Sequence, residues 1–260
     1  MIMNKKIIAM LMTAAMTVTL ITGCGAGAAS SGKSNAIADG VLTIGTNAEF
    51  PPFEYVGDNG EPDGFDIALI NAIGEKLGVE VEVENMEFDS LVSSIGSKID
   101  VAIAGMTVTE ERKQSVDFSD PYFDAVQHVL VPAGSDIKSY EDLEGKIIGC
   151  QLGTTGDFIV EEIEGAESHQ YNKALQAVED LVNGKLDAVI IDSNPAAVFT
   201  SNYPDKIRNL DGEDFGFEPE HYAIAMPKGD KALADAVNKA ISELKADGTF
   251  DSLVEKYIQQ

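Results

Sequence analysis

Short runs of apolar residues alternate with helix-type patterns along the chain from residue 41 onward. We expect strands at residues 42–46, 79–83, 100–106, 146–151 and 187–192. Most of these runs are almost continuously apolar, which is typical of parallel strands covered on both faces. In residues 79–84 Val alternates with Glu, so this strand is expected at a sheet edge or without a helix over one face.

The segments between the expected strands have the apolar spacing of helices. In residues 65–77 the apolar positions repeat at helical intervals and the pattern stops at Gly78; these positions are Phe65, Leu69, Ile70, Ile73 and Leu77. Residues 173–182 and 231–244 have patterns of the same kind. The alternation of strands and helices predicts an α/β protein with mainly parallel sheets.

A weak internal repeat indicates two similar lobes. Residues 96–103 and 183–190 each have the pattern of a helix end, a turn and a buried strand. Extended segments bounded by prolines, at 127–131 and 222–226, are expected to be the two crossings between the lobes. The expected domains are residues 40–126 with 222–260 for lobe 1, and residues 127–221 for lobe 2.

The first residues have the pattern of an export signal, since Lys5 and Lys6 precede an apolar run at 7–21. This run is shorter than the roughly 20 apolar residues of a membrane-spanning helix. Residues 21–24 (Ile-Thr-Gly-Cys) resemble the bacterial lipoprotein processing box, in which cleavage precedes the cysteine and Cys24 is acylated. Residues 1–23 are therefore expected to be a lipoprotein signal peptide and residues 24–39 a flexible tether. An ordinary secretory signal is the alternative.

The charge and the cysteine and histidine content exclude several classes of function. The formal net charge is −26, which argues against nucleic acid and anionic membrane surfaces as partners, because both attract basic patches. With Cys24 acylated, Cys150 has no partner for a disulfide and is expected to be a small core residue. His128, His169 and His221 lack metal-ligand spacing, so neither a metal nor another cofactor is expected.

Polar residues gather where the expected strands end, which is where ligands bind in open α/β sheets. The residues that follow these ends are Asn47, Glu49, Phe50, Thr107, Thr109, Arg112, Gly153, Thr154, Thr155 and Gly156, and the last strand ends on Asp192. Together they offer a cation, an anion, an aromatic face and two helix starts with hydroxyl groups. An amino-acid zwitterion needs this combination. The loop 153–156 lacks the Gly-Lys-Ser/Thr ending of a nucleotide-binding loop, so phosphate hydrolysis is not supported.

Charge assigns roles to two of these residues, and each also has a plainer interpretation. Arg112 suits an α-carboxylate, aided by amides at Thr155 and Gly156, and Asp192 suits an α-ammonium. Arg112 could instead be a solvated surface charge and Asp192 a helix N-cap. Phe50 and Phe88 could be ordinary core residues.

Residues 40–258 resemble the solute-binding proteins of polar amino-acid ABC transporters. The motifs that carry the resemblance are residues 44–53 (Ile-Gly-Thr-Asn-Ala-Glu-Phe-Pro-Pro-Phe), 64–67 (Gly-Phe-Asp-Ile), 104–112 (Ala-Gly-Met-Thr-Val-Thr-Glu-Glu-Arg), 118–122 (Phe-Ser-Asp-Pro-Tyr), 185–188 (Lys-Leu-Asp-Ala) leading to Asp192, and 245–249 (Lys-Ala-Asp-Gly-Thr). Each motif alone is weak, but six in order are specific. Ala68 departs from the family, whose members usually carry an acidic residue there.

The resemblance implies a two-lobed periplasmic-binding-protein fold of type II character, with two hinge crossings, that closes around an amino acid. It implies that Phe50 and Phe88 sandwich the ligand side chain. It also implies that Arg112, Thr107 and Thr155 hold the carboxylate, and that the Gly105 carbonyl and Asp192 hold the ammonium. Asn47 stands where members that take cationic amino acids have an acid, so an uncharged polar side chain, reached by Gln151, is favoured. Glu49 leaves a basic ligand open.

The expected protein is a monomeric receptor, anchored through Cys24 to the outer face of the cytoplasmic membrane or in the periplasm. It would deliver its ligand to an ABC permease with its ATPase, and it would not be an enzyme. Two alternatives are open. One is a dehydratase-like enzyme for small carboxylates on the same scaffold, which would need an unpaired cleft acid. The other is a sensory ligand-binding module without transport.

Overall fold

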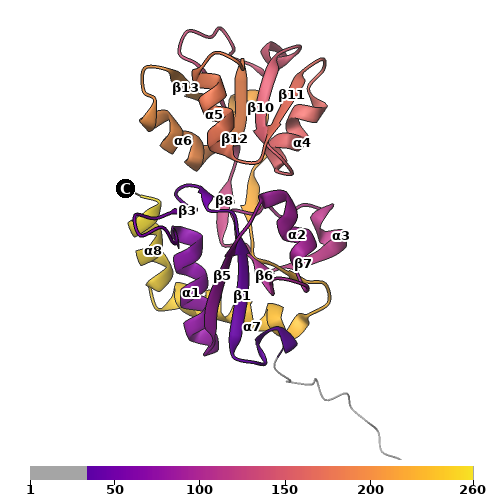
Figure 1. Ribbon diagram of the computed structural model, residues 1–260, viewed down its shortest axis with the longest axis vertical. Coiled ribbons are helices and arrows are strands. Elements are labelled where there is room, and N and C mark those ends of the chain that lie inside the picture. The colour runs from indigo at the N-terminus through magenta and orange to yellow at the C-terminus, as the bar shows by residue number, and fades with distance from the viewer. Residues whose placement is uncertain (1–33, 260) are drawn as a thin grey trace, which may run out of the picture. The chain divides into compact units, whose positions relative to one another are not determined.

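Two five-stranded sheets organise the described part of the chain, residues 34–259 of the computed structural model (Figure 1). The sheet of lobe 1 has the order β5-β1-β6-β15-β7, and that of lobe 2 has the order β11-β10-β12-β9-β13. The strands of lobe 1 are β1 (Val41–Thr46), β5 (Glu80–Asn85), β6 (Val101–Ala102), β7 (Val116–Phe118) and β15 (Ala225–Pro227). Those of lobe 2 are β9 (Gln127–Pro132), β10 (Ile147–Gln151), β11 (Glu167–Tyr171), β12 (Ala188–Asp192) and β13 (Ile207–Leu210).

Helices accompany each sheet. Those of lobe 1 are α1 (Phe65–Leu77), α2 (Leu91–Ser94), α3 (Arg112–Ser115), α7 (Lys231–Ala246) and α8 (Thr249–Tyr257). Those of lobe 2 are α4 (Thr155–Glu162), α5 (Ala174–Val182) and α6 (Ser193–Asn202). The remaining elements are the short helices η1 (Asn35–Ile37), η2 (Phe88–Ser90), η3 (Tyr140–Leu143) and η4 (Gly212–Phe215), the small sheet β2 (Glu49–Phe50), β3 (Glu54–Val56) and β4 (Pro62–Asp63), and the ribbon β8 (Phe123–Ala125) with β14 (Glu220–Tyr222).

The structure confirms the α/β fold class, and each sheet is parallel on one side only. In lobe 1, β1 pairs in parallel with β5 and β6, whereas β15 pairs antiparallel with β6 and β7. In lobe 2, β10 pairs in parallel with β11 and β12, whereas β9 pairs antiparallel with β12 and β13. The antiparallel strands β9 and β15 directly follow β8 and β14 along the chain. Each sheet is therefore mixed because a strand arriving from the other lobe runs against the parallel half.

Helix α1 and strand β5 match their sequence patterns. Gly78 ends α1 with φ of 71°, and its N–H reaches the carbonyls of Glu75 and Gly74, which satisfies groups that the helix leaves without partners. β5 is the edge strand expected from its alternation, since its Val residues are half-buried and its Glu residues exposed.

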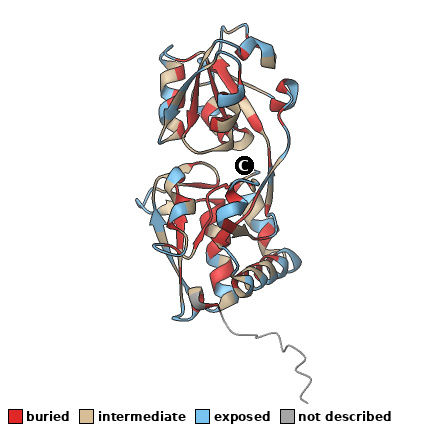
Figure 2. Cartoon of the chain, turned by 90° about the vertical axis from the view of Figure 1, so that its right-hand side faces the viewer, coloured by how far each residue is buried: buried red, intermediate tan, exposed pale blue. Residues whose placement is uncertain are grey.

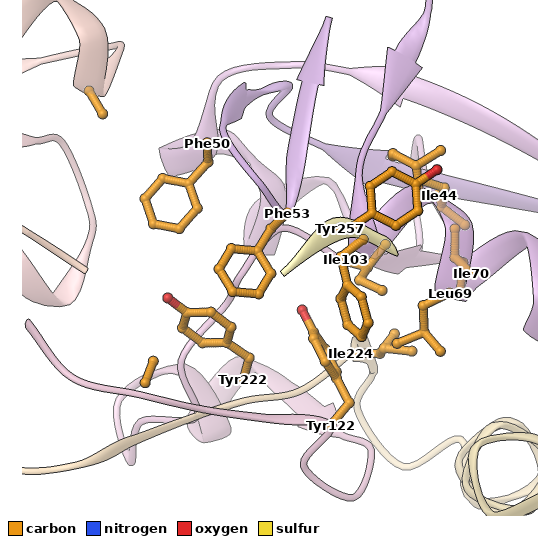
Figure 3. Packing of buried hydrophobic residues seen from close by; sticks show 14 of the residues in the cluster. Ile44, Phe50, Phe53, Leu69, Ile70, Ile103, Tyr122, Tyr222, Ile224 and Tyr257 are labelled. Carbon is orange, nitrogen blue, oxygen red and sulfur yellow. The ribbon is translucent and has the colours of Figure 1, made fainter. Parts of the chain in front are cut away.

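The core of each lobe lies on both faces of its sheet, as Figure 2 shows by the buried residues in the strands. In lobe 1, Val101 and Ile103 belong to the cluster that includes α1 and α7, while Ala102 and Ala104 face the opposite cluster beneath α2. This alternation is that of a central strand covered on both sides. Near the end of the sheet, the rings of Phe50, Phe53, Tyr122 and Tyr222 lie together (Figure 3).

The internal repeat corresponds to one hydrogen-bond pattern that occurs in both lobes. The Asp100 carboxylate accepts the N–H of Thr43 at 2.9 Å, and the Asp187 carboxylate accepts the N–H of Ile147 at 2.9 Å. Both acids precede a central strand and hold the start of the neighbouring parallel strand. The resemblance between residues 96–103 and 183–190 thus reflects equivalent places in two similar sheets.

The crossings between the lobes differ from the expected segments. The antiparallel pair β8 and β14 connects the two sheets, with Glu220 opposite Ala125 and Tyr222 opposite Phe123. Residues 127–131, expected to be a crossing, form strand β9 of lobe 2, and residues 222–226 lead into β15 of lobe 1. The reason is burial: Val129, Leu130 and Val131 are fully buried, and such a run belongs inside a sheet.

The ordered fold begins before the expected end of the tether. Ile37 in η1 is only 5% exposed and belongs to the core cluster of lobe 1, and Ser34 donates a hydrogen bond to Asp230. Residues 34–39 therefore pack on lobe 1, because Ile37 supplies an apolar anchor. The expected signal peptide, Cys24 and the remainder of the tether lie outside the described residues. No helix within residues 34–259 has the length and apolar character needed to cross a membrane.

Candidate functional site

One pocket brings together every ligand-binding residue expected from the sequence. In this structure its free volume is about 10 Å³, roughly the space of one water molecule, so the lining side chains fill most of it. The expected residues that line it are Asn47, Phe50, Phe88, Gly105, Thr107, Arg112, Gln151, Thr155 and Asp192, and the others are Glu54, Ala104 and Thr154. The lining comes from the strand ends of both lobes, as expected for α/β sheets.

Arg112 is a buried cation held by both lobes. It is 8% exposed, and its guanidinium donates to the Thr107 carbonyl at 2.7 Å and to the Gly153 carbonyl at 2.9 Å. Its charged group also lies 5.3 Å from the centre of the Phe88 ring, within the range of a cation–π contact. Burial lowers the pKa of Arg112 to about 10, so it remains protonated at neutral pH. Arg112 is therefore not the solvated surface charge of the plainer interpretation.

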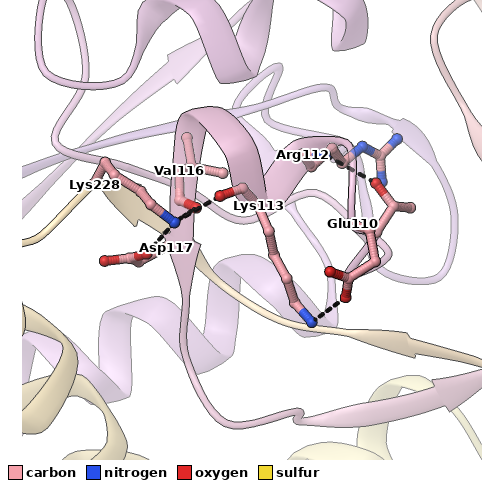
Figure 4. A network of polar contacts seen from close by, with 7 residues as sticks. Glu110, Arg112, Lys113, Val116, Asp117 and Lys228 are labelled. Atoms are coloured by element: carbon pink, nitrogen blue, oxygen red, sulfur yellow. Dashed lines mark hydrogen bonds and ion pairs between the residues drawn. The ribbon is translucent and has the colours of Figure 1, made fainter.

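The short helix α3 that begins at Arg112 is fixed from outside the pocket (Figure 4). The Thr109 hydroxyl accepts the N–H of Arg112 at 3.1 Å. The Lys228 ammonium donates to the carbonyl of Lys113, the next residue of the helix, at 2.6 Å and pairs with Asp117, beyond the helix end, at 2.7 Å. These contacts hold the backbone of α3, so the guanidinium is positioned on a supported turn.

Asp192 is the buried acid of the pocket. It ends β12, is 6% exposed and accepts the hydroxyl of Tyr222 at 2.5 Å. It occupies the N-cap position of α6, but its side chain makes no capping hydrogen bond. Burial raises the pKa of Asp192 to about 7, and the Glu220 carboxylate adds to this rise. The carboxylate is therefore directed to the pocket and not to its own helix.

The N-terminus of α4 presents its N-cap Thr154 and its first residue Thr155 to the pocket. The Thr154 hydroxyl caps α4 by accepting the N–H of Asp157 at 3.3 Å, and the Asp157 carboxylate accepts the N–H of Gly153 at 2.9 Å. Asp157 is 3% exposed, so this turn is held from within lobe 2. The start of α4, with the partial positive charge of a helix N-terminus, lies at the pocket wall.

Two pairs of side chains join the lobes beside the pocket. Gln151 of lobe 2 donates to the Asn47 side-chain oxygen at 2.9 Å, and Asn47 donates to the Met86 carbonyl at 2.9 Å. Lys173 of lobe 2 forms a salt bridge of 2.5 Å with Glu49, the acid that left a basic ligand open. The uncharged pair of Asn47 and Gln151 lines the pocket, whereas the charge of Glu49 is paired with that of Lys173.

The two aromatic residues lie on the pocket wall and are mostly covered, with Phe50 7% and Phe88 9% exposed. Gly105 has φ of 51°, a conformation that favours glycine, and a Cβ there would lie 3.1 Å from the Phe50 ring. The absence of a side chain at residue 105 thus allows the ring and the backbone to meet.

A buried pair of carboxyl groups supports Gly105 from below. Asp66 is fully buried and accepts the N–H of Gly105 and the hydroxyl of Tyr122, both at 2.7 Å. It lies beside Glu54, which is 1% exposed and lines the pocket. Burial raises the pKa of Asp66 to about 6, and burial with the charge of Asp66 raises that of Glu54 well above its usual value. Burial and their mutual repulsion therefore disfavour the ionised form of this pair of carboxyls.

Glu220 lies behind Thr107 and Thr155. Its Oε2 accepts the hydroxyl of Thr107 at 2.5 Å and that of Thr155 at 2.9 Å. The side chain of Gln127 approaches the same oxygen at 3.5 Å. A half-buried carboxylate of the hinge ribbon therefore contacts one pocket residue from each lobe.

Sequence reasoning missed Glu54, Asp66, Glu220 and Tyr222 as part of this site. Asp66 and Tyr222 look like core positions, and Glu54 and Glu220 look like ordinary surface acids in short extended segments. The signal for Asp66 was available, because it stands in the motif Gly-Phe-Asp-Ile at 64–67. Among residues 34–259, no group of three or more His, Cys, Asp or Glu side chains is arranged to hold a metal ion.

Comparison with known proteins supports these observations. Residues 42–260 match the family described as bacterial extracellular solute-binding proteins, family 3. A probable histidine-binding protein of Neisseria gonorrhoeae is 35% identical, over 98% of this chain and 96% of its own length. The solved structure of an ancestral arginine-binding protein bound to arginine has a TM-score of 0.79 and 43% identity, covering 84% of this chain and 98% of that one.

A second solved structure is that of an ancestral amino-acid-binding protein described as a precursor of cyclohexadienyl dehydratase. It has a TM-score of 0.79 and 36% identity, over 85% of this chain and 97% of that one. The fold expected from the sequence is confirmed by these structures. The chain belongs to family 3 of the bacterial extracellular solute-binding proteins.

Proposed function

We propose that this protein is an extracytoplasmic receptor that binds a polar amino acid between its lobes and delivers it to an ABC permease for import. One observation carries the proposal: Arg112 and Asp192, two buried groups of opposite charge, line one pocket from different lobes. This is the complement of an amino-acid zwitterion. Family membership and the named ligands of the relatives support it.

Each part of the ligand has a counterpart in the pocket. The guanidinium of Arg112 and the residues Thr107 and Thr155 would hold the carboxylate, while Asp192 and the Gly105 carbonyl would hold the ammonium. A charge-assisted hydrogen bond contributes about 1.5–3 kcal/mol. Micromolar affinity requires about 8 kcal/mol, so contacts from both lobes must act together.

We infer that the ligand side chain is polar and uncharged and lies between Phe50 and Phe88. The amide pair Asn47 and Gln151 offers hydrogen bonds without a net charge. Glu49 is neutralised by Lys173, which removes the main attraction for a basic side chain. Two of the relatives are named for histidine and arginine, whose side chains can carry a positive charge. The charge of the ligand side chain is therefore the first property to test.

Closure would couple binding to transport. Without a ligand, burying Arg112 and Asp192 costs free energy because both lose water, as their shifted pKa values reflect. The ligand's charges offset this cost only when the lobes are closed, so binding shifts the population toward the closed form. The closed form would be the one that the permease, with its ATPase, recognises.

A thermal-shift screen tests the proposal directly. The protein lacking residues 1–24 is heated with each of the twenty amino acids, and with cystine and ornithine. A ligand at 100 times its dissociation constant stabilises the folded state by about 2.7 kcal/mol, a readily visible shift. We expect a shift with one or a few uncharged polar amino acids. If none of the compounds shifts the transition, the receptor proposal fails, and small carboxylates with product detection become the next screen.

That second screen addresses the dehydratase-like alternative, which needs an acid able to donate a proton to a substrate. Glu54 is the pocket acid that comes closest to this requirement, since burial and the charge of Asp66 raise its pKa well above the usual value. Its position beside Asp66, which accepts the N–H of Gly105, favours support of a binding pocket over a catalytic role. A sensory function has no observation in its favour over transport.

We also propose that Cys24 is acylated and anchors a monomeric receptor to the outer face of the cytoplasmic membrane or in the periplasm. Expressed in a bacterial host, the wild-type protein should incorporate labelled palmitate and partition into the detergent phase of Triton X-114. Cys24→Ser should do neither. Equal partitioning of the two proteins would contradict the anchor and leave an ordinary secretory signal.

A further inference from the structure

We propose that Glu220 is a positioning residue that latches the lobes in the closed form. This inference rests on the proposed function, since it assigns a role to a residue behind the ligand pocket. Glu220 begins β14, one of the two strands that cross between the lobes. Its carboxylate would hold Thr107 of lobe 1 and Thr155 of lobe 2 at the same time.

The hydrogen bonds converge on a single atom. Oε2 of Glu220 accepts from Thr107 at 2.5 Å and from Thr155 at 2.9 Å, and the Gln127 amide lies at 3.5 Å. Gln127 also donates to the Thr155 hydroxyl at 3.1 Å. Because the two threonines belong to different lobes, one oxygen can contact both only while the lobes are closed.

Proton counting separates the latch from the ligand contacts. A threonine hydroxyl has one proton, and here those of Thr107 and Thr155 are donated to Glu220. The ligand carboxylate is then left with the Arg112 guanidinium and with backbone N–H groups at the pocket wall. Glu220 therefore acts on two threonines that line the pocket, through hydroxyl contacts that are separate from those to the ligand.

The position of Glu220 in the hinge suits this role. Thr155 lines the ligand pocket and also a second hollow that contains Glu220, Phe158 and Phe217. Glu220 thus approaches Thr155 from the side away from the ligand. Its charge attracts Arg112 and repels Asp192, so it favours the closed form most when a ligand ammonium neutralises Asp192.

Affinity and lobe closure together test the latch. Glu220→Ala should bind L-glutamine, L-histidine or L-arginine, whichever the wild type binds, about 10- to 100-fold more weakly, which corresponds to the loss of charge-assisted hydrogen bonds. Glu218→Ala removes an exposed charge from the same segment and should bind like the wild type. Circular dichroism verifies that each variant is folded.

Closure is measured by the distance between spin labels on Asp58→Cys in lobe 1 and Asn202→Cys in lobe 2, both exposed positions; buried Cys150 should stay unlabelled. In Glu220→Ala, the short distances between the two labels should be less populated than in the wild type, both with and without ligand. Equal affinity and equal distances in the two proteins would overturn the latch, and tighter binding would show that Glu220 competes with the ligand. If the wild type binds no amino acid, the proposed function fails, and the unliganded distances alone decide the latch.

Discussion

Replacing Arg112 by alanine is expected to weaken amino-acid binding by about 100-fold or more while leaving the fold intact. The substitution removes the buried guanidinium, which is the proposed partner of the ligand carboxylate. Truncating one member of such a buried charge pair costs about 2–5 kcal/mol of binding free energy. The fold should persist because Thr109 and Lys228 hold helix α3 through its backbone. Isothermal titration calorimetry gives the affinity and thermal denaturation gives the stability.

Two further variants sharpen this test. Arg112→Lys keeps the charge but loses the planar fork that reaches both the Thr107 and Gly153 carbonyls, so its affinity should fall between those of the wild type and the alanine variant. Lys113→Ala removes the next residue, whose ammonium pairs with Glu110 at the surface, and should bind normally. An Arg112→Ala protein with wild-type affinity would remove the central claim about the carboxylate site.

Asp192→Asn should abolish most binding and yet stabilise the unliganded protein at high pH. The amide lacks the charge that pairs with the ligand ammonium, so we expect an affinity loss of about 100-fold. In the wild type, the folded-state pKa of about 7 lies above the unfolded value near 4, so ionisation disfavours the fold. The stabilising effect of this group is complete below pH 4 and is lost as the pH rises through 7.

The size of this effect follows from linkage. A pKa raised from near 4 to about 7 means that the wild type loses about 4 kcal/mol of folding free energy between low pH and pH 8. The asparagine variant does not lose it, because asparagine does not titrate. Urea unfolding at pH 5 and pH 8 should therefore show a stability difference between variant and wild type that grows with pH. Asp205→Asn, at an exposed position, is the matched control. A difference that does not change with pH would contradict the assigned burial cost.

The expected site residues line one pocket because most of them stand at or just after strand ends. Thr107 follows β6, Gln151 ends β10 and Asp192 ends β12, and such ends meet at one edge of each sheet. Helix α1 was predicted at its observed bounds because its apolar spacing and Gly78 are local signals. The assignment of roles to Arg112 and Asp192 also drew on the family resemblance.

The features of the fold and of the site that were not predicted depend on contacts between segments that are distant in the sequence. Glu220 meets Thr107 and Thr155 only because β14 pairs with β8, and no pattern near residue 220 announces that pairing. The antiparallel pairing in each sheet was missed for the same reason, since β9 and β15 fall in segments expected to be extended crossings and no local pattern gives their partners. Glu54 and Asp66 likewise become a buried pair of carboxyls with raised pKa values only after folding has covered both.

The place of β15 in the sheet of lobe 1 determines the order in which the two lobes can be completed. Ala225 lies between its partners Ala102 and Phe118, so the sheet has a gap between β6 and β7 until that residue has been synthesised. Every strand of lobe 2 precedes it in the chain, and α7 and α8, which pack against α1, follow it. During synthesis, the lobe that begins first is therefore the one that is finished last.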